Sequence, residues 1–168
     1  MIVLGIDPGY AIVGYGVLHY NANHFKIIEH GAILTEAKTP FTERILKIHS
    51  EISEIIKRTK PDAMSIEKLF FNTNTTTAID VAQARGIILL AAKENGVPVF
   101  EYTPLQVKSA VTGYGKADKK QVMEMIKNLL GLKAVPKPDD TADALAVAIC
   151  HAHSAGSLLG LINSGGQI

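Results

Sequence analysis

The sequence predicts an α/β fold with a mixed five-stranded sheet flanked by helices, and two observations predict it. Apolar, strand-like segments at residues 2–7, 12–18 and 25–34 follow one another with only short turns between them, which is typical of an antiparallel meander. Two further short strands, 63–67 and 97–102, each follow a segment of helical periodicity. A helical crossover returns the chain in its original direction, so these two strands should pair parallel to the first.

The helices are predicted from apolar residues at helical spacing. In the first of them, Ile45, Ile48, Ile52, Ile55 and Ile56 share one face and charged residues occupy the rest. Such a pattern indicates a helix that packs on the sheet and carries no chemistry. The expected helices are 42–58, 78–94, 104–111, 118–130 and a last one that begins near residue 139.

The composition limits the class of protein. With 168 residues, 47% hydrophobic and 20% charged, the chain is expected to form one domain over residues 1–155, followed by a flexible tail over 156–168. Cys150 is the only cysteine, so an intramolecular disulfide and a cysteine-cluster zinc site are excluded, and an inert core position is expected for it. No leader-like segment and no apolar run of about 18 residues is seen. A cytoplasmic location is therefore expected.

Two carboxylates stand where short apolar strands end. Asp7 closes the segment Ile2–Ile6, and Glu67 closes 63–66. Alone, Asp7 could cap the turn at Pro8–Gly9, and Glu67 could be a solvated side chain at a strand end. If the two strands are parallel neighbours, however, both carboxylates reach the same edge of the sheet, where a buried acid needs a cation or a proton.

A third acidic group opens the last predicted helix. Asp139, Asp140 and Asp143 precede an Ala-rich apolar run, and Asp140 and Asp143 share a helical face. One aspartate there would only cap the helix. Together with Asp7 and Glu67, Asp140 and Asp143 supply oxygen ligands without Cys or His, which suits Mg²⁺ or Mn²⁺. Two such ions would serve phosphoryl transfer. His151 and His153, late in this helix, are expected to be solvent-exposed and not ligands.

Other features fit a polyanionic substrate. Residues 103–138 contain seven lysines and two acids, a local excess of +5 in a chain of net charge +1. This excess is either a phosphate-binding face or an ordinary solvated helix face. Phe70 and Phe71 stand in a Thr/Asn-rich loop, where they either dock on the core or stack on bases. The glycines at 5, 9, 14 and 16 indicate either close approach of a phosphate backbone or simple bending of the strands.

Five motifs in order over residues 1–153 give a specific resemblance. The chain resembles the RuvC-type Holliday-junction resolvases, which have the ribonuclease-H-like fold. The matching segments are Gly5-Ile6-Asp7-Pro8-Gly9 with Gly14-Tyr15-Gly16, Ile66-Glu67 with Phe70, Gln83-Ala84-Arg85-Gly86, Gln106-Val107-Lys108 with 113–119, and 140–146.

The resemblance implies a homodimer that binds a four-way DNA junction and makes symmetric nicks in two opposed strands, leaving 5′-phosphate ends. It implies that Asp7, Glu67, Asp140 and Asp143 are the catalytic metal ligands, with Asp139 as a possible substitute. It also implies a branch-migration motor as partner and a dimer seam on the helix that begins near Ala78. The implied DNA-binding residues are Phe70, Phe71, Arg85, Lys108, Lys116 and Lys119.

Two other classes of function remain open from the residues alone. Actin-like ATPases also place Gly-Ile-Asp on a first strand, but they need a second phosphate hairpin and a second domain, for which this chain has no room. A non-catalytic nucleic-acid-binding protein could share the fold. The intact set of four carboxylates argues against this alternative.

Overall fold

A five-stranded sheet organises the chain and confirms the predicted fold class. The computed structural model describes residues 1–69 and 77–156. The strands are β1 (Ile2–Asp7), β2 (Ile12–Asn21), β3 (His24–Leu34), β4 (Ala63–Glu67) and β5 (Val99–Tyr102), in the spatial order β3-β2-β1-β4-β5. β1, β2 and β3 are antiparallel, whereas β4 pairs parallel to β1 and β5 pairs parallel to β4.

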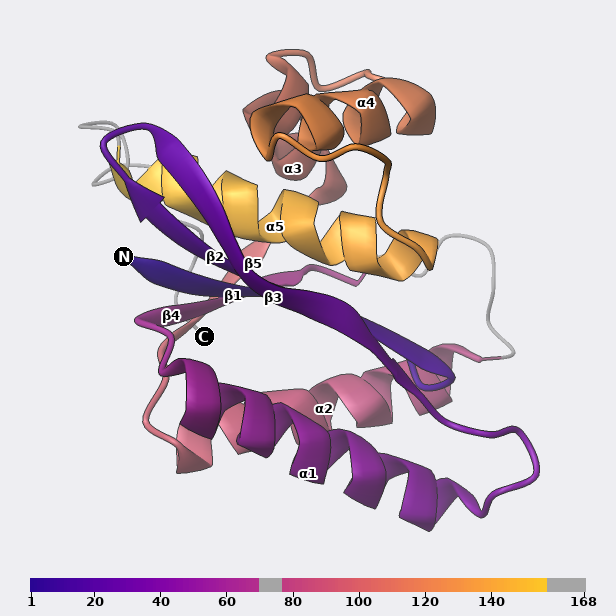
Figure 1. The fold of residues 1–168 in the computed structure, drawn as a ribbon. Helices are drawn as coiled ribbons and strands as arrows, with labels where there is room; N and C mark the ends of the chain where they lie inside the picture. Colours follow the sequence, from indigo (N-terminus) through magenta and orange to yellow (C-terminus); the bar gives the residue numbers. More distant parts are fainter. Residues whose placement is uncertain (70–76, 157–168) are drawn as a thin grey trace.

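The β2–β3 hairpin is longer than the sequence pattern predicts. Its two strands extend to Asn21 and back from His24, and the turn residues Ala22 and Asn23 both adopt positive φ. Two consecutive residues at positive φ are what a tight two-residue hairpin requires, because they match the twist of the strands. The hairpin therefore projects beyond the rest of the sheet (Figure 1).

Helices cover both faces of the sheet. α1 (Phe41–Thr59) and α2 (Ala78–Glu94) pack on one face, and α5 (Asp139–Gly156) crosses the other. α3 (Pro104–Thr112) and α4 (Lys119–Leu129) pack against α5 on its far side (Figure 1). Both α3 and α4 begin with a capping box, at Thr103 with Gln106 and at Asp118 with Gln121.

Two apolar cores result, one on each face of the sheet. Leu4, Ile6 and Ile66 point toward α1 and α2, whereas Val3 and Tyr102 belong to the core formed with α5. Side chains alternate along a strand, so Asp7 and Glu67 lie on the α5 face. Cys150 is buried in this core, as predicted. No described helix combines the length and apolar character that crossing a membrane requires.

The glycines of β1 and β2 serve a purpose that the sequence interpretation missed. A Cβ on Gly14 would lie 1.9 Å from the carbonyl oxygen of Asp140, and one on Gly5 would lie 2.1 Å from that of Ala144. The glycines therefore let the backbone of α5 lie directly on the sheet. At Gly5 and Gly14 the close neighbour is thus the backbone of α5, another part of the same chain, and not a phosphate backbone.

The expectation that His151 is solvent-exposed was wrong. His151 is buried, its Nδ1 lies 2.8 Å from the hydroxyl of Tyr102, and its ring packs on Phe100. Burial lowers the pKa of His151 to about 4, so it is neutral at physiological pH. His153 is partly buried, with its Nδ1 3.0 Å from the carbonyl oxygen of Ala110. α5 remains packed against its neighbours at these positions instead of fraying.

Candidate active site

The carboxyl ends of β1 and β4 place two acids side by side. Ile6 of β1 is paired with Ile66 of β4 in parallel register, so the next residues, Asp7 and Glu67, leave the sheet at the same edge. The connection that follows β4 stays close to the sheet, because the backbone N–H of Lys68 donates to the carbonyl oxygen of Tyr102 at 2.8 Å. The predicted juxtaposition of these two carboxylates is therefore built into the strand register.

α5 brings the other two acids over this edge. Asp7 is paired across β1 and β2 with Gly14, and the backbone of Asp140 lies on Gly14. The hydroxyl of Thr141 donates to the carbonyl oxygen of Gly31 at 3.0 Å and fixes the first turn of α5 to β3. α5 begins at Asp139, so Asp139 and Asp140 both lie in its first turn, and Asp143 follows one turn later.

Asp7, Glu67 and Asp143 resist ionisation, first because they are buried and then because negative charges lie near them. Burial raises the pKa of Asp7 to about 8, with further contributions from the negative charges of Asp143, Glu67 and Asp140. Burial, and then the charge of Asp143, also raises the pKa of Glu67. A cluster of carboxyl groups that resist ionisation needs a compensating cation. The donor set consists of oxygen atoms only, which fits a hard divalent ion.

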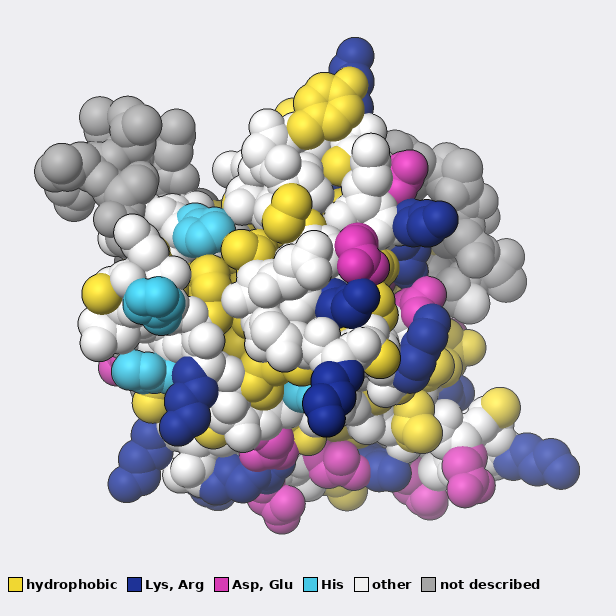
Figure 2. All heavy atoms as spheres, turned by 45° about the horizontal axis from the view of Figure 1, so that its top comes forward, with side chains coloured by type: hydrophobic (Ala, Val, Ile, Leu, Met, Phe, Trp, Pro, Cys, Tyr) yellow, Lys and Arg dark blue, Asp and Glu magenta, His cyan; other side chains and the backbone are white. Residues whose placement is uncertain are grey.

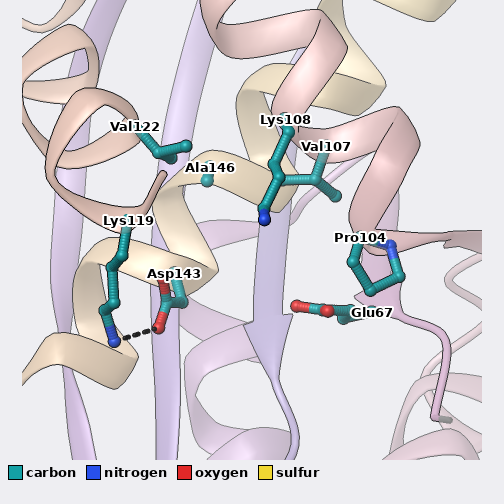
Figure 3. A pocket seen from close by; sticks show the side chains of 8 residues that line it. All are labelled: Glu67, Pro104, Val107, Lys108, Lys119, Val122, Asp143 and Ala146. Carbon is teal, nitrogen blue, oxygen red and sulfur yellow. Dashed lines mark hydrogen bonds and ion pairs between the residues drawn. The ribbon is translucent and has the colours of Figure 1, made fainter. Parts of the chain in front are cut away.

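Lysines flank the acids around a pocket of about 250 Å³. Figure 3 shows Lys108 from α3 and Lys119 from α4 pointing toward the acidic side chains of Glu67 and Asp143. Nζ of Lys119 lies 3.3 Å from Oδ2 of Asp143. The remaining walls are apolar and come from α3, α4 and α5, at Pro104, Val107, Val122 and Ala146.

The side chains as they stand do not enclose an ion. Across residues 1–69 and 77–156, no three side chains of the metal-binding types are grouped closely enough to hold a metal. The ammonium group of Lys119 contacts Asp143 instead, and it also lies 3.3 Å from Oδ2 of Asp139. The acids are thus assembled at one edge of the sheet, and a cationic side chain of the protein lies among them.

The predicted DNA-binding residues fall into three groups. Lys108 and Lys119 line the pocket, and Lys116 is exposed in the connection between α3 and α4. Arg85 does not reach the pocket. It lies on α2, on the opposite face of the sheet, and forms an ion pair with Glu101 of β5. Phe70 and Phe71 lie outside the described residues.

The basic excess predicted for residues 103–138 lies on the outer surface of α3, α4 and their connections. Lys116, Lys119, Lys120, Lys133 and Lys137 are all exposed. Figure 2, which brings this side forward, shows basic side chains with a few acidic ones between them. The sequence interpretation missed Lys137 as a member of the site, although it stands two residues before Asp139; its Nζ lies 2.6 Å from Oδ1 of Asp139.

Comparison with known proteins identifies the family of this chain. The family model described as crossover junction endodeoxyribonuclease RuvC matches residues 3–151. The enzyme of that name from Desulfitobacterium hafniense (strain DSM 10664 / DCB-2) is 57% identical over 92% of this chain and 93% of its own length. The one from Clostridioides difficile (strain 630) is 55% identical over 99% of both chains.

Solved structures give the same result. The structure described as Thermus thermophilus RuvC in complex with Holliday junction substrate covers 100% of this chain and 99% of its own, with 37% identity and a TM-score of 0.92. The yeast mitochondrial Holliday junction resolvase Ydc2, at 14% identity and a TM-score of 0.66, shares the fold. On the strength of the family model and of relatives that match almost end to end, this chain belongs to the RuvC family of crossover junction endodeoxyribonucleases.

Proposed function

We propose that this protein resolves four-way DNA junctions by nicking two opposed strands symmetrically and leaving 5′-phosphate ends. One observation carries the proposal. Asp7 and Glu67 leave the sheet at one edge, and the negative charges of Asp140 and Asp143, from the start of α5, act on Asp7. Two lysines line the pocket beside Glu67 and Asp143. Membership of the RuvC family supports the same activity and implies dependence on a divalent metal ion.

In this proposal, Asp7, Glu67, Asp140 and Asp143 hold two Mg²⁺ ions, and Mn²⁺ can replace them. The bound ions would activate a water for attack on the phosphodiester and neutralise the charge that develops on the leaving oxygen. Asp7 must lose its proton to serve as a ligand, and its raised pKa means that ion binding at neutral pH releases this proton. Ion binding should therefore strengthen as the pH rises toward 8.

The lysines and the Phe-bearing loop would hold the DNA. Lys108 and Lys119 are placed at the pocket to contact phosphates near the cut, and Lys116 extends the basic surface outward. Phe70 and Phe71 would stack on bases of the opened junction. Arg85 would reach DNA only if it left Glu101, so we propose that its contribution is the weakest of the set.

We further propose a homodimer that forms through α2. Ile79, Gln83, Gly86 and Leu90 follow a helical spacing that puts them on one face. Ile79 is 71% exposed and Leu90 is 47% exposed, and between them Gly86 has no atom within 4 Å of where a Cβ would stand. An exposed apolar stripe with a glycine at its centre suits close packing against a second copy. Two copies would supply the two cuts.

The remaining elements of the proposal rest on family resemblance. Residues 1–155 would form one nuclease domain in the cytoplasm, and residues 156–168 would follow it as a tail. A branch-migration motor would deliver the junction to the dimer. Of the tail, residues 157–168 lie outside the described part of the chain.

A cleavage assay with Mg²⁺ tests the proposed function. It compares a mobile four-way junction with linear duplex of the same sequence, using wild type, Asp7→Asn and the control Glu36→Gln. Glu36 is exposed and is not among the charges that raise the pKa of Asp7, so its variant removes the same charge outside the acidic cluster. We expect paired nicks in the junction with wild type and control only. Equal cutting of linear duplex would refute junction specificity, and cutting by Asp7→Asn would refute the site.

A further inference from the structure

The ammonium group of Lys119 is shared between two aspartates at the mouth of the site. Its Nζ lies 3.3 Å from Oδ2 of Asp143 and 3.3 Å from Oδ2 of Asp139. Lys119 is the first residue of α4, and the capping box of Asp118 with Gln121 holds its backbone. The long side chain can therefore move between the two carboxylates while its base stays fixed.

Asp139 differs from the four acids proposed as metal ligands. Its side chain is 47% exposed, and its other oxygen, Oδ1, lies 2.6 Å from Nζ of Lys137. Hydrogen bonds from Lys137 and then Lys119 lower the pKa of Asp139, whereas burial raises the pKa of Asp7, Glu67 and Asp143. The negative charge of Asp139 contributes to the raised pKa of Asp143, but it is not among the charges that raise the pKa of Asp7, to which Asp140 does contribute. Asp139 is thus an outer, lysine-paired carboxylate.

We propose that Asp139 is a positioning residue for Lys119 and not a metal ligand. Lys119 contacts Asp143, as Figure 3 shows. Asp143 would release the ammonium group on holding a divalent ion, and Asp139 would then keep Lys119 at the site. This inference rests on the proposed function, because it needs Asp143 to be a ligand. Lys119 then stays at the mouth of the pocket, where a substrate phosphate would arrive.

The physical reason is competition between two cations for one carboxylate. When Asp139 is present, the ammonium group of Lys119 can leave Asp143 and still have a carboxylate partner 3.3 Å away. Without Asp139, an ammonium group that leaves Asp143 has only solvent around it. Lys119 therefore binds Asp143 more strongly in that variant. Loss of Asp139 should therefore weaken ion binding only while Lys119 is present. A true ligand would weaken it in either case.

The experiment measures Mg²⁺ affinity by titration calorimetry at pH 8 without DNA. It uses wild type, Asp139→Asn, Lys119→Met and the double variant, with thermal melting to confirm that each one folds. We expect Asp139→Asn to weaken Mg²⁺ binding by about threefold to fivefold in the wild-type background, which is the scale of an exposed ion pair. In the Lys119→Met background we expect a change of less than about twofold, as screened long-range charge allows.

Two further variants serve as controls. Lys137→Met removes a positive charge that pairs with Asp139 but does not contact Asp143. Lys119→Met removes the positive charge that competes for Asp143 itself. Lys119→Met should therefore tighten Mg²⁺ binding more than Lys137→Met does. Asp139→Glu keeps the charge and should restore most of the wild-type affinity.

The outcomes distinguish a wrong role for Asp139 from a wrong proposed function. A loss of about tenfold or more in both backgrounds would make Asp139 a ligand or its direct support and would overturn the inference. No loss in either background would overturn it as well. If wild type itself binds no Mg²⁺ and cuts no junction, the proposed function fails, and this inference falls with it.

Discussion

Replacing Asp7 by asparagine should stabilise the metal-free protein while abolishing its response to divalent ions. The raised pKa of Asp7, about 8 against an ordinary value of 3.8, means that the folded chain holds a proton that the unfolded chain has lost at neutral pH. Folding must then take up this proton, which costs free energy that grows as the pH rises from about 4 toward 8. Asparagine has no proton to take up.

The magnitude follows from the pKa difference. One pKa unit corresponds to about 1.4 kcal/mol, so at pH 7 the difference between the two states gives about 4 kcal/mol as an upper limit. Asparagine is itself polar and partly buried there, so a net gain of about 2 kcal/mol is expected. For a domain of this size, that gain raises the melting temperature by roughly 4–8 °C.

The assay is urea unfolding followed by circular dichroism, since the chain has no tryptophan. Wild type, Asp7→Asn and the control Glu36→Gln are compared at pH 7 and at pH 4 with chelator, and again at pH 7 with saturating Mg²⁺. The gain should appear at pH 7 and be absent in the control, and at pH 4 it should give way to a loss of up to about 2 kcal/mol, because the cost of burying the amide remains. Mg²⁺ should stabilise wild type and not Asp7→Asn. A gain that persists at pH 4, or no gain at pH 7, would refute the reasoning.

Three other predictions follow from the packing. Gly14→Ala should destabilise the fold by about 3 kcal/mol or more, because its Cβ would lie 1.9 Å from the carbonyl oxygen of Asp140. Gly16→Ala should cost less, because its Cβ would first meet the side chain of Leu145, with the Leu145 Cα 3.3 Å away. Chemical unfolding of both variants would contradict this reasoning if Gly16→Ala proved the more destabilising. Leu90→Glu should dissociate the proposed dimer in sedimentation velocity. The control Leu46→Glu, at an exposed leucine on α1, should leave the dimer intact. A Leu90→Glu dimer of unchanged affinity would contradict the proposed interface. Between pH 7 and pH 5 the wild type should lose about 2 kcal/mol of stability, because the buried His151 has a folded pKa of about 4 and only the unfolded chain takes up the proton in this range. His151→Gln should not show this loss. Equal losses in both proteins would contradict the lowered pKa.

The strand order and the meeting of the acids could be predicted because local patterns determine them. Short turns force the first three strands into a meander, and helical crossovers make β4 and β5 parallel to β1. Once β1 and β4 are parallel neighbours, Asp7 and Glu67 reach one edge. The helical spacing of Asp140 and Asp143 is equally local.

What could not be predicted depends on contacts between distant parts of the chain. The glycines at 5 and 14 could be recognised as sites of close approach, but only the path of α5 shows what approaches. Arg85 stands in a motif shared with the family, yet its partner Glu101 lies on a strand that no local pattern connects with it. His151 was misjudged for the same reason, since the hydroxyl that it meets belongs to Tyr102 on β5.

The position of α5 in the chain order has a consequence for synthesis. Asp7 and Glu67 are made early, but Asp140 and Asp143 come from the last described helix, and α5 also covers one whole face of the sheet. A nascent chain that ends before residue 139 therefore has half of the carboxylates and an open sheet. Such a ribosome-bound intermediate can neither assemble the acidic site nor complete its core. The acidic edge of the sheet is therefore complete only after α5 has been made and has packed on the sheet.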